Sequence, residues 1–413
     1  MEHPGTGRWF PAAWVALVLL GLLWTLWLWP APISDYELYW NEAGGTVPYE
    51  RGGAGVALFA LARYLFPQPQ WAALAVNLPS AALLLWLFWR HDRTRWRAFA
   101  LAGSACLLLT TPYLGVVQID VVATALLGAC WVLLLRPPAA WPRAASIGTA
   151  VLVGIMAVST RPQFALTLAA LAGLLLLAWL PARGRTRASS MIGLAGMLAA
   201  VAVAGFAIDQ SARVAAGTGE HVRTKSGVTL YAGLLLADAG PACGMWTQRA
   251  EDAAFEERAK PLRDVIVERI AAQPPSHWLR IAQCKFVRQI ALPGAFALYW
   301  ASEPLREEAG AAPTAGQRRR LDAVEALYPW ESRLQRVLVL AIYAAALVAF
   351  VYGWHRQRHA FALLPIAWLL SFWIVHLVFE VQGRYFLATI LLLPLLSALV
   401  LRLREPEART PDG

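Results

Sequence analysis

The sequence predicts an all-α polytopic membrane protein with about ten transmembrane helices, interfacial helices and one small extracytoplasmic region. Composition is the first reason: 58% of the 413 residues are hydrophobic and 15% are charged, whereas soluble domains carry about 25% charged residues. The second reason is distribution, because the apolar residues gather in runs of about 20, the length of a membrane span. The mean hydropathy of +0.49 agrees with both.

Several apolar runs are long enough to be candidate spans. The first, 10–29, is too long and too rich in Trp for a signal peptide, so we expect a retained helix. The others are 71–89, 98–117, 121–135, 144–160, 162–180, 190–208, 335–353, 360–379 and 385–401. Segment 53–66 is apolar but short and contains Arg63, which predicts an interfacial or partly dipping helix instead of a span.

The arginines predict the orientation. They lie mostly in short loops between apolar segments, so the net charge of +10 does not indicate a nucleic-acid-binding protein. With ten spans, loops 90–97, 136–143, 181–187 and 355–359 share one side with both termini. The positive-inside rule makes that side the cytoplasm and predicts a multi-pass protein of the cell (inner) membrane, with the opposite loops outside.

This topology divides the chain into three parts. Residues 1–208 form an N-terminal transmembrane module whose first outer loop, 31–70, holds the interfacial helix. Residues 209–334 form the extracytoplasmic region, and residues 335–413 form a C-terminal transmembrane module with a short cytoplasmic tail.

Within 209–334, the pattern predicts a helix over 251–273, a break at Pro274-Pro275, and a polar loop over 302–320. Between the last two, Trp278, Ile281, Phe286 and Ile290 recur at helical spacing among basic residues, which is typical of a helix lying on a membrane surface. Two pairs of cysteines remain: Cys243 and Cys284 are free to form a disulfide if this region is outside, whereas Cys106 and Cys130 fit small packing residues.

Acidic residues gather in the predicted outer loops. Asp35, Glu37 and Glu42 follow the first span, where a solvated, inert loop is the simpler interpretation. Asp120 begins the fourth span beside Gln118, and an ionisable group at membrane depth is a functional candidate.

Cationic residues reach the same side. Arg161 lies in the tight outer turn between the fifth and sixth spans, against the charge bias of the other loops, so we expect it to pair with an anion. The 280–288 stretch and Arg384 are the other cationic places. Acids beside cations at one membrane face suit a reaction with an anionic, lipid-linked substrate.

A resemblance accompanies these residues. The acidic SDYELYW run after the first span, the outer QID ahead of the fourth, the TRPQ turn and the terminal GRYFLATILLLPLL resemble the C-type glycosyltransferase superfamily, especially bacterial protein-mannosyltransferase and aminoarabinose-transferase members. The resemblance implies a membrane glycosyltransferase that takes a sugar from a polyprenyl-phosphate donor to a glycan, lipid or protein acceptor, by inverting displacement.

The same resemblance implies roles for individual residues. The first-loop acid of the family corresponds to Asp35, with Glu37 as the other choice because a tyrosine separates the two acids, and the second-loop acid corresponds to Asp120. The phosphate-binding cations correspond to Arg161, Lys285, Arg384 and Arg288. The resemblance assigns no cofactor or metal ligand and leaves a divalent cation open; membrane lipids are the remaining partner.

Two rival interpretations stay open. A transporter or flippase for a lipid-linked saccharide also needs outer cations and intramembrane acids, but it predicts two related halves, which the sequence lacks. A non-catalytic assembly subunit would make the outer carboxylates incidental.

Overall fold

The computed structural model describes residues 9–32, 35–46, 52–93, 97–183, 188–217, 228–238, 240, 243–291, 301–303, 305–306, 314–356 and 358–403. These residues form helices and short helical turns, and none of those described lies in a strand. The chain is an all-α membrane protein, as its composition predicts.

Fifteen helices carry the fold: α1 (Trp9–Leu28), α2 (Asp35–Ala43), α3 (Gly53–Leu65), α4 (Pro69–His91), α5 (Ala98–Leu109), α6 (Asp120–Leu135), α7 (Arg143–Thr160), α8 (Gln163–Ala182), α9 (Ala188–Ala215), α11 (Gln248–Glu256), α12 (Leu262–Ala271), α13 (Pro275–Ala291), α15 (Ala315–His355), α16 (Leu364–Val378) and α17 (Leu387–Leu401) within the described residues. Short turns accompany them: η1 (Thr111–Gly115), η2 (Tyr231–Leu235, a π-turn), η3 (Ala360–Leu363) and η4 (Gly383–Phe386).

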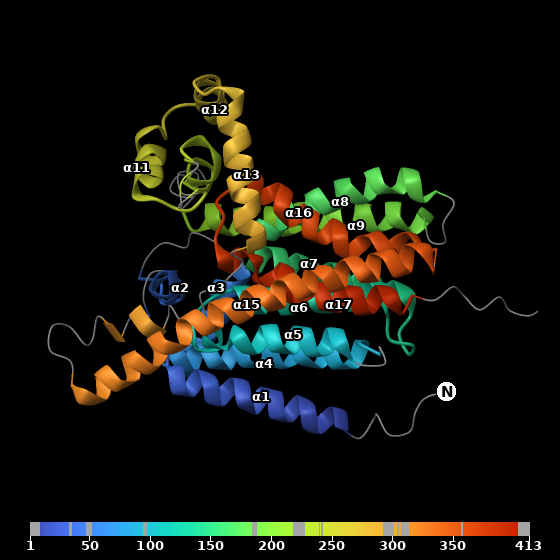
Figure 1. The fold of residues 1–413 in the computed structure, drawn as a ribbon, viewed down its shortest axis with the longest axis horizontal. Helices are drawn as coiled ribbons and strands as arrows, with labels where there is room; N and C mark the ends of the chain where they lie inside the picture. Colours follow the sequence, from blue (N-terminus) through green and yellow to red (C-terminus); the bar gives the residue numbers. More distant parts are fainter. Residues whose placement is uncertain are drawn as a thin grey trace, which may run out of the picture.

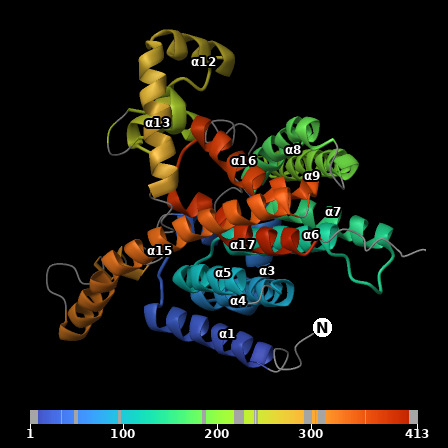
Figure 2. The ribbon, with the colours of Figure 1, turned by 45° about the vertical axis from the view of Figure 1, so that its right-hand side comes forward.

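The long helices run side by side in one bundle (Figures 1 and 2). Successive bundle helices alternate in direction, so each of them begins at one end of the bundle and finishes at the other. We call the end that carries α2 and α3 the α2–α3 end, and the other the opposite end. At the centre lies α17, whose residues from Leu387 to Val400 are all buried, with α6 packed beside it.

Seven segments are long and apolar enough to cross a membrane: α1, α4, α7, α8, α9, α15 and residues 360–378. The other three predicted spans correspond to α5, α6 and α17, which are shorter. The 16 residues of α6 extend about 24 Å, against about 30 Å of bilayer hydrocarbon. Because neighbours cover most of α6 and α17, these two helices need not match the lipid along their whole length. The count of ten spans stays a prediction.

The helix ends beside the predicted arginine-rich loops gather at one end of the bundle. The ends of α4, α6, α8 and α15 that lead into these loops all lie at the opposite end, where α1 also begins (Figure 1). The cytoplasmic assignment of that end rests on the positive-inside rule and stays a prediction.

The predicted interfacial helix is α3, which caps the bundle at the α2–α3 end and packs against α4, α7 and α9. Its approach depends on Gly52, whose φ of 71° is in the left-handed region. A Cβ at Gly52 would lie 2.4 Å from the Thr160 carbonyl oxygen, so any other residue would push α3 off the bundle. This contact places α3 directly over the α7–α8 turn.

Helix α15 departs from the sequence-based prediction. Its 41 residues extend about 60 Å, roughly twice the hydrocarbon thickness, and the first half projects beyond the bundle (Figure 1). A capping box between Thr314 and Gln317 starts it, so the part of the predicted polar loop from Ala315 onward is helical. Arg320 then donates to the last carbonyls of α1, 2.6 Å to Leu28 and 3.2 Å to Trp27.

Residues 228–238 and 243–291 form a small unit beside the bundle, which we call the overhanging subdomain (Figure 1). It has its own core, built around Tyr231, Ala250 and Val265. The predicted helix over 251–273 is divided into α11 and α12, because Pro261 interrupts it. A disulfide joins Cys243 and Cys284, which confirms that pairing, and Cys106 and Cys130 are buried free thiols.

Neither predicted domain boundary coincides with the end of a helix. Helix α9 continues past 208 to Ala215, and α15 begins well before 335. The boundaries therefore mark where hydropathy falls, while the helices extend further out.

Candidate functional site

Asp120 and Arg161 form a buried ion pair at the α2–α3 end. Asp120 is the first residue of α6 and 2% exposed, and Arg161 occupies the turn between α7 and α8 and is 7% exposed. The prediction that Arg161 pairs with an anion is therefore confirmed, and that anion is the other predicted site residue. One oxygen of the pair, Asp120 Oδ2, meets no hydrogen-bond donor among the described residues.

The position of Asp120 is fixed by the chain around it. The buried side-chain amide of Asn77 on α4 donates to the carbonyls of Tyr113 and Val116, at 3.0 and 2.8 Å. These bonds hold η1, the turn that leads into α6. Thr25 on α1 donates to the Thr111 carbonyl at 2.8 Å and secures the same turn. Because hydrogen bonds from α1 and α4 both hold η1, the start of α6 and therefore Asp120 are fixed in position.

Arg161 opens a chain of polar contacts toward the overhanging subdomain. It donates to Gln163 Oε1 at 3.0 Å, and Gln163 Nε2 lies 2.6 Å from His376 Nε2. Because the Gln163 oxygen already accepts from Arg161, its amide nitrogen donates to His376. His376 Nδ1 then carries the proton and donates to the Glu380 carbonyl at 2.6 Å. Tyr385 lies beneath this chain, with its ring 5.4 Å from Arg161.

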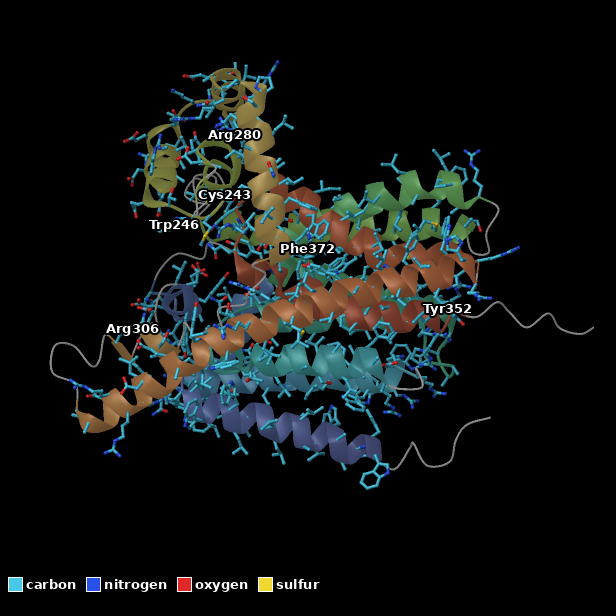
Figure 3. The ribbon with its side chains drawn as sticks, in the orientation of Figure 1. Cys243, Trp246, Arg280, Arg306, Tyr352 and Phe372 are labelled. Atoms are coloured by element: carbon cyan, nitrogen blue, oxygen red, sulfur yellow. A yellow bond between two sulfur atoms is a disulfide. The ribbon has the colours of Figure 1, made fainter. Side chains whose placement is uncertain are left out.

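The segment after α16 is held by the subdomain. The backbone N–H of Glu380 donates to the Thr229 carbonyl at 2.8 Å, and that of Val381 donates to the Gly244 carbonyl at 2.7 Å. The Glu380 carboxylate accepts from the N–H of Trp246 at 3.2 Å. Figure 3 shows Cys243 and Trp246 where the subdomain meets the bundle. The Arg161–Gln163–His376 chain thus ends in backbone that the subdomain fixes.

Lys285 is fully buried and makes a different contact from the one predicted. Its ammonium donates to the carbonyls of Gly233, Leu377 and Phe379, at 2.6, 2.8 and 2.8 Å, which uses all three of its hydrogens. Burial lowers the pKa of Lys285 to about 7, and the Glu380 carboxylate opposes that shift. In this arrangement Lys285 fastens α13 to the end of α16, and its phosphate-binding role stays a prediction.

Arg288 differs from the other predicted cations. Its guanidinium is partly buried, and the one acceptor it meets among the described residues is the Met245 thioether sulfur, at 2.6 Å. Its Nε has no partner there, and burial lowers its pKa with no carboxylate acting against the shift. A sulfur is a weak acceptor, so this cation has hydrogen-bonding capacity to spare. The side chain of Arg384 lies outside the described side chains, and its role stays a prediction.

The first-loop acids lie on one short helix. Asp35 begins α2 and is partly buried, Glu37 is exposed, and Glu42 is buried at 5% exposure. The expectation of a solvated loop is therefore wrong for Glu42. Arg63 on α3 ties α2 down, donating to the Trp40 carbonyl at 2.5 Å and lying 4.3 Å from the Trp40 ring.

Helix α3 connects α2 to the ion pair. An added Cβ at Gly55 would lie 2.5 Å from Ile119 and 3.0 Å from Thr160, the residues that precede Asp120 and Arg161. The acidic helix therefore rests on the element that covers the Asp120–Arg161 pair. The structure brings Asp35, Asp120 and Arg161 to the same end of the bundle.

A second buried ion pair was not predicted. Asp209 and Arg213 lie one turn apart on α9, 2.7 Å from each other, and Asp209 also accepts from the N–H of Gly53 at 3.1 Å. The sequence did contain a signal for this pair: an acidic and a basic residue stand four positions apart at the end of an apolar run, which is the spacing of an ion pair on a helix. No cluster of three or more His, Cys, Asp or Glu suited to a metal occurs among the described residues, and the divalent cation stays a prediction.

No protein-family model, no curated protein and no solved structure matches the chain.

Proposed function

We propose that this protein is a membrane glycosyltransferase, which moves a sugar from a polyprenyl-phosphate-linked donor to a lipid, glycan or protein acceptor on the extracytoplasmic side. The proposal rests on where the buried charges lie. In the described residues, buried Asp, Glu, Lys and Arg side chains at the α2–α3 end are Glu42, Asp120, Arg161, Asp209, Arg213, Lys285 and Glu380. Asp92 is the buried charged residue at the opposite end.

This distribution favours chemistry at one membrane face. Desolvated charges are costly and persist where they are paired or functional. A transporter for a lipid-linked saccharide would need polar groups along a path through the bundle. Further along the bundle, the buried polar side chains are neutral groups such as Ser371 and Ser397. The distribution therefore supports the enzyme over the transporter.

The proposed reaction is an inverting displacement. The acceptor hydroxyl oxygen attacks the anomeric carbon while the bond from that carbon to the phosphate oxygen breaks. Asp35 takes the hydroxyl proton, and the polyprenyl phosphate leaves with the electron pair of the broken bond. A general base contributes about 10²–10⁴ to such a rate. The exposed Glu37 is the other candidate base on α2.

Two arginines are assigned to the phosphate. Arg288 has unused donors and no carboxylate partner among the described residues, so it is free to neutralise the leaving group. Arg161 is held by Asp120 and Gln163 and would present its remaining donors in a fixed orientation. Asp120 would position the acceptor or a bound cation through its free oxygen.

The first experiment identifies the product. Mass spectrometry of surface glycans and lipids from cells with and without this gene should reveal one sugar modification that depends on the gene. Accumulated donor in the deletion strain would accompany its loss. Unchanged glycans and lipids, together with altered distribution of a lipid-linked saccharide across the membrane, would favour the flippase.

Asp35→Asn should reduce transfer by about 10²–10⁴ while the protein inserts and purifies normally. The matched variant is Glu37→Gln on the same helix, which should stay near wild-type activity. The measurement is release of polyprenyl phosphate from a labelled donor in proteoliposomes. Full turnover by Asp35→Asn would remove it as the base, and an inactive Glu37→Gln would transfer that role.

Arg288→Gln should weaken donor binding by about 10–100-fold, since a hydrogen bond to a charged group contributes about 1.5–3 kcal/mol. Arg280, two turns earlier on α13 and exposed, supplies the matched control as Arg280→Gln. Binding of the donor lipid to both variants in detergent is the readout. Equal affinity in the two variants would exclude Arg288 from the phosphate site.

A further inference from the structure

Helix α13 has two apolar faces, and one of them has no partner among the described residues. The inner face is packed: Ile281 is 1% exposed and Lys285 is fully buried. The sequence pattern assigned Ile281 to a membrane surface, and that assignment is wrong. On the outer face, Leu279 is 72% exposed, Val287 is 54% exposed and Phe286 is 42% exposed. Residues 279, 286 and 287 share one side of a helix.

The orientation of α13 restricts what can cover this face. Figures 1 and 2 show α13 running across the general direction of the bundle helices, and therefore along the membrane plane. It packs against α16, as η2 of the same subdomain also does. The half of α13 that begins at Pro275 extends past α16 and α8 (Figure 1). The bundle helices therefore do not cover this half of α13.

The exposed face is continuous with a surface that lipid must cover. Phe286 packs edge-on against Trp373 of α16, with ring centroids 5.1 Å apart. On α16, Leu370, Ile374 and Val378 are exposed along one side of a helix apolar enough to span a membrane. Since bilayer hydrocarbon covers these residues, the Phe286–Trp373 contact carries the same surface onto α13.

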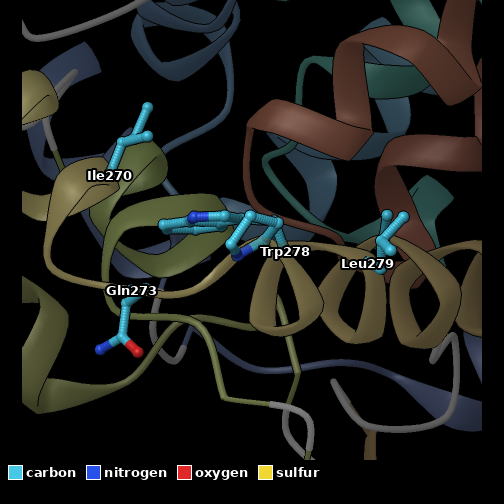
Figure 4. A pocket seen from close by; sticks show the side chains of 6 residues that line it. Ile270, Gln273, Trp278 and Leu279 are labelled. Carbon is cyan, nitrogen blue, oxygen red and sulfur yellow. The ribbon is translucent and has the colours of Figure 1, made fainter.

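An apolar depression widens the surface at the start of α13. It has a volume of about 560 Å³ and is lined by Ile270, Gln273, Pro275, Trp278, Leu279 and Ala282. Figure 4 shows Trp278 lying between Ile270 and Leu279. Trp at the edge of such a surface is typical of the membrane interface, where its ring lies at headgroup level. Arg280 is exposed beside it, as basic residues commonly are on helices at a membrane surface.

We infer that the outer face of α13 and the adjoining depression are embedded in the lipid leaflet at the α2–α3 end, with phospholipid acyl chains as the occupant. The subdomain is then a membrane-resting unit instead of one that projects into water. This inference concerns the bilayer alone and holds whether or not the protein transfers sugars. A second copy of the chain or another protein on this face is the competing occupant.

The test places one fluorescent amino acid at Leu279 or at Val287 by stop-codon suppression, which avoids extra cysteines near the disulfide. Each protein is reconstituted into phosphatidylcholine–phosphatidylglycerol vesicles. Arg263, exposed on α12, is the matched position in the same subdomain. Quenching by brominated acyl chains and by aqueous iodide is then compared across the three positions.

We expect brominated lipid to quench the labels at 279 and 287 several-fold more than the label at 263, with iodide showing the reverse order. Iodide quenching at 279 and 287 equal to that at 263 would show water at this face and overturn the inference. Protection from both quenchers would also overturn it, because a protein would then be the occupant. Two label positions and an intact disulfide, checked by non-reducing mass spectrometry, keep a misfolded variant from deciding the result.

Discussion

The two buried ion pairs at the α2–α3 end are similar in chemistry and different in construction. Asp120 and Arg161 come from separate helices, and Arg161 continues the contact through Gln163 to His376. Asp209 and Arg213 lie one turn apart on α9, where Asp209 also holds the start of α3 through Gly53. The first pair joins distant segments and continues into a chain of polar contacts. The second fastens one helix to another, so burial of charge alone does not identify a functional site.

The largest difference should appear in activity after each pair is neutralised. Asp120→Asn/Arg161→Gln removes both charges without leaving one unpaired, and we expect at least about 100-fold slower sugar transfer. Asp209→Asn/Arg213→Gln should transfer sugar at close to the wild-type rate per folded molecule. Both rates are measured in proteoliposomes with equal amounts of inserted protein. Similar activity in the two double variants would contradict the assignment of the first pair to the reaction and of the second pair to structure.

Breaking the Asp209–Arg213 pair on one side should have its main effect on stability. Asp209→Asn removes the carboxylate 2.7 Å from the buried Arg213 guanidinium, which should lower the free energy of unfolding by about 3–5 kcal/mol. Adding Arg213→Gln should restore most of that loss, because the buried positive charge is then removed as well. Chemical unfolding in detergent compares the single and double variants. A double variant as unstable as the single one would mean that loss of the ion pair itself, and not the cost of the remaining buried Arg213 charge, sets the stability.

A third, solvent-accessible pair gives the smallest expected effect. Glu257 and Arg269 in the overhanging subdomain are 2.9 Å apart, with side chains 18% and 28% exposed. The Tyr231 hydroxyl, donating at 2.6 Å, and then Arg269 hold the pKa of Glu257 below its usual 4.5. A lowered carboxyl pKa stabilises the fold above the unfolded value, and that contribution disappears as pH falls through the folded value. Glu257→Gln should therefore cost at most about 1 kcal/mol at pH 7.

The measurement is the melting temperature of wild type and Glu257→Gln between pH 7 and pH 3. The gap between them should narrow as pH falls below about 4.5, the usual pKa of the group. Arg249, whose partner Asp238 lies 3.9 Å away with both side chains largely exposed, supplies a control as Arg249→Gln with no measurable change. A gap that widens at low pH would reverse the assigned direction of the pKa shift.

Hydropathy was sufficient to predict most of the bundle, because apolar runs of span length have few alternatives in a membrane. Asp120 and Arg161 were also predictable, since each is a charge placed where its surroundings disfavour one. The direction in which individual side chains point could not be predicted in the same way. Glu42 looked solvated, yet α2 folds and turns it inward, and Ile281 looked lipid-facing, yet it packs inward on α13.

The polar chain beyond Arg161 shows the limit of local patterns. Gln163 and Glu380 stand in the TRPQ and EVQGRYF stretches, but nothing in the sequence joins either to His376. A single His near the end of an apolar helix is most simply a packed core residue. The three meet because α8 and α16 pack side by side, and pairing of distant helices is information that one sequence does not contain.

The position of the disulfide in the chain bears on the order in which parts of the protein fold. Cys243 and Cys284 both precede α15, α16 and α17 in the chain, so the two cysteines are synthesised before those helices. The cross-link can therefore close on the subdomain alone and fix Gly244 against Lys285. When α16 is later inserted, its last carbonyls, Leu377 and Phe379, meet a lysine that is already in place. During biogenesis, the C-terminal helices would then dock onto a subdomain that has already folded.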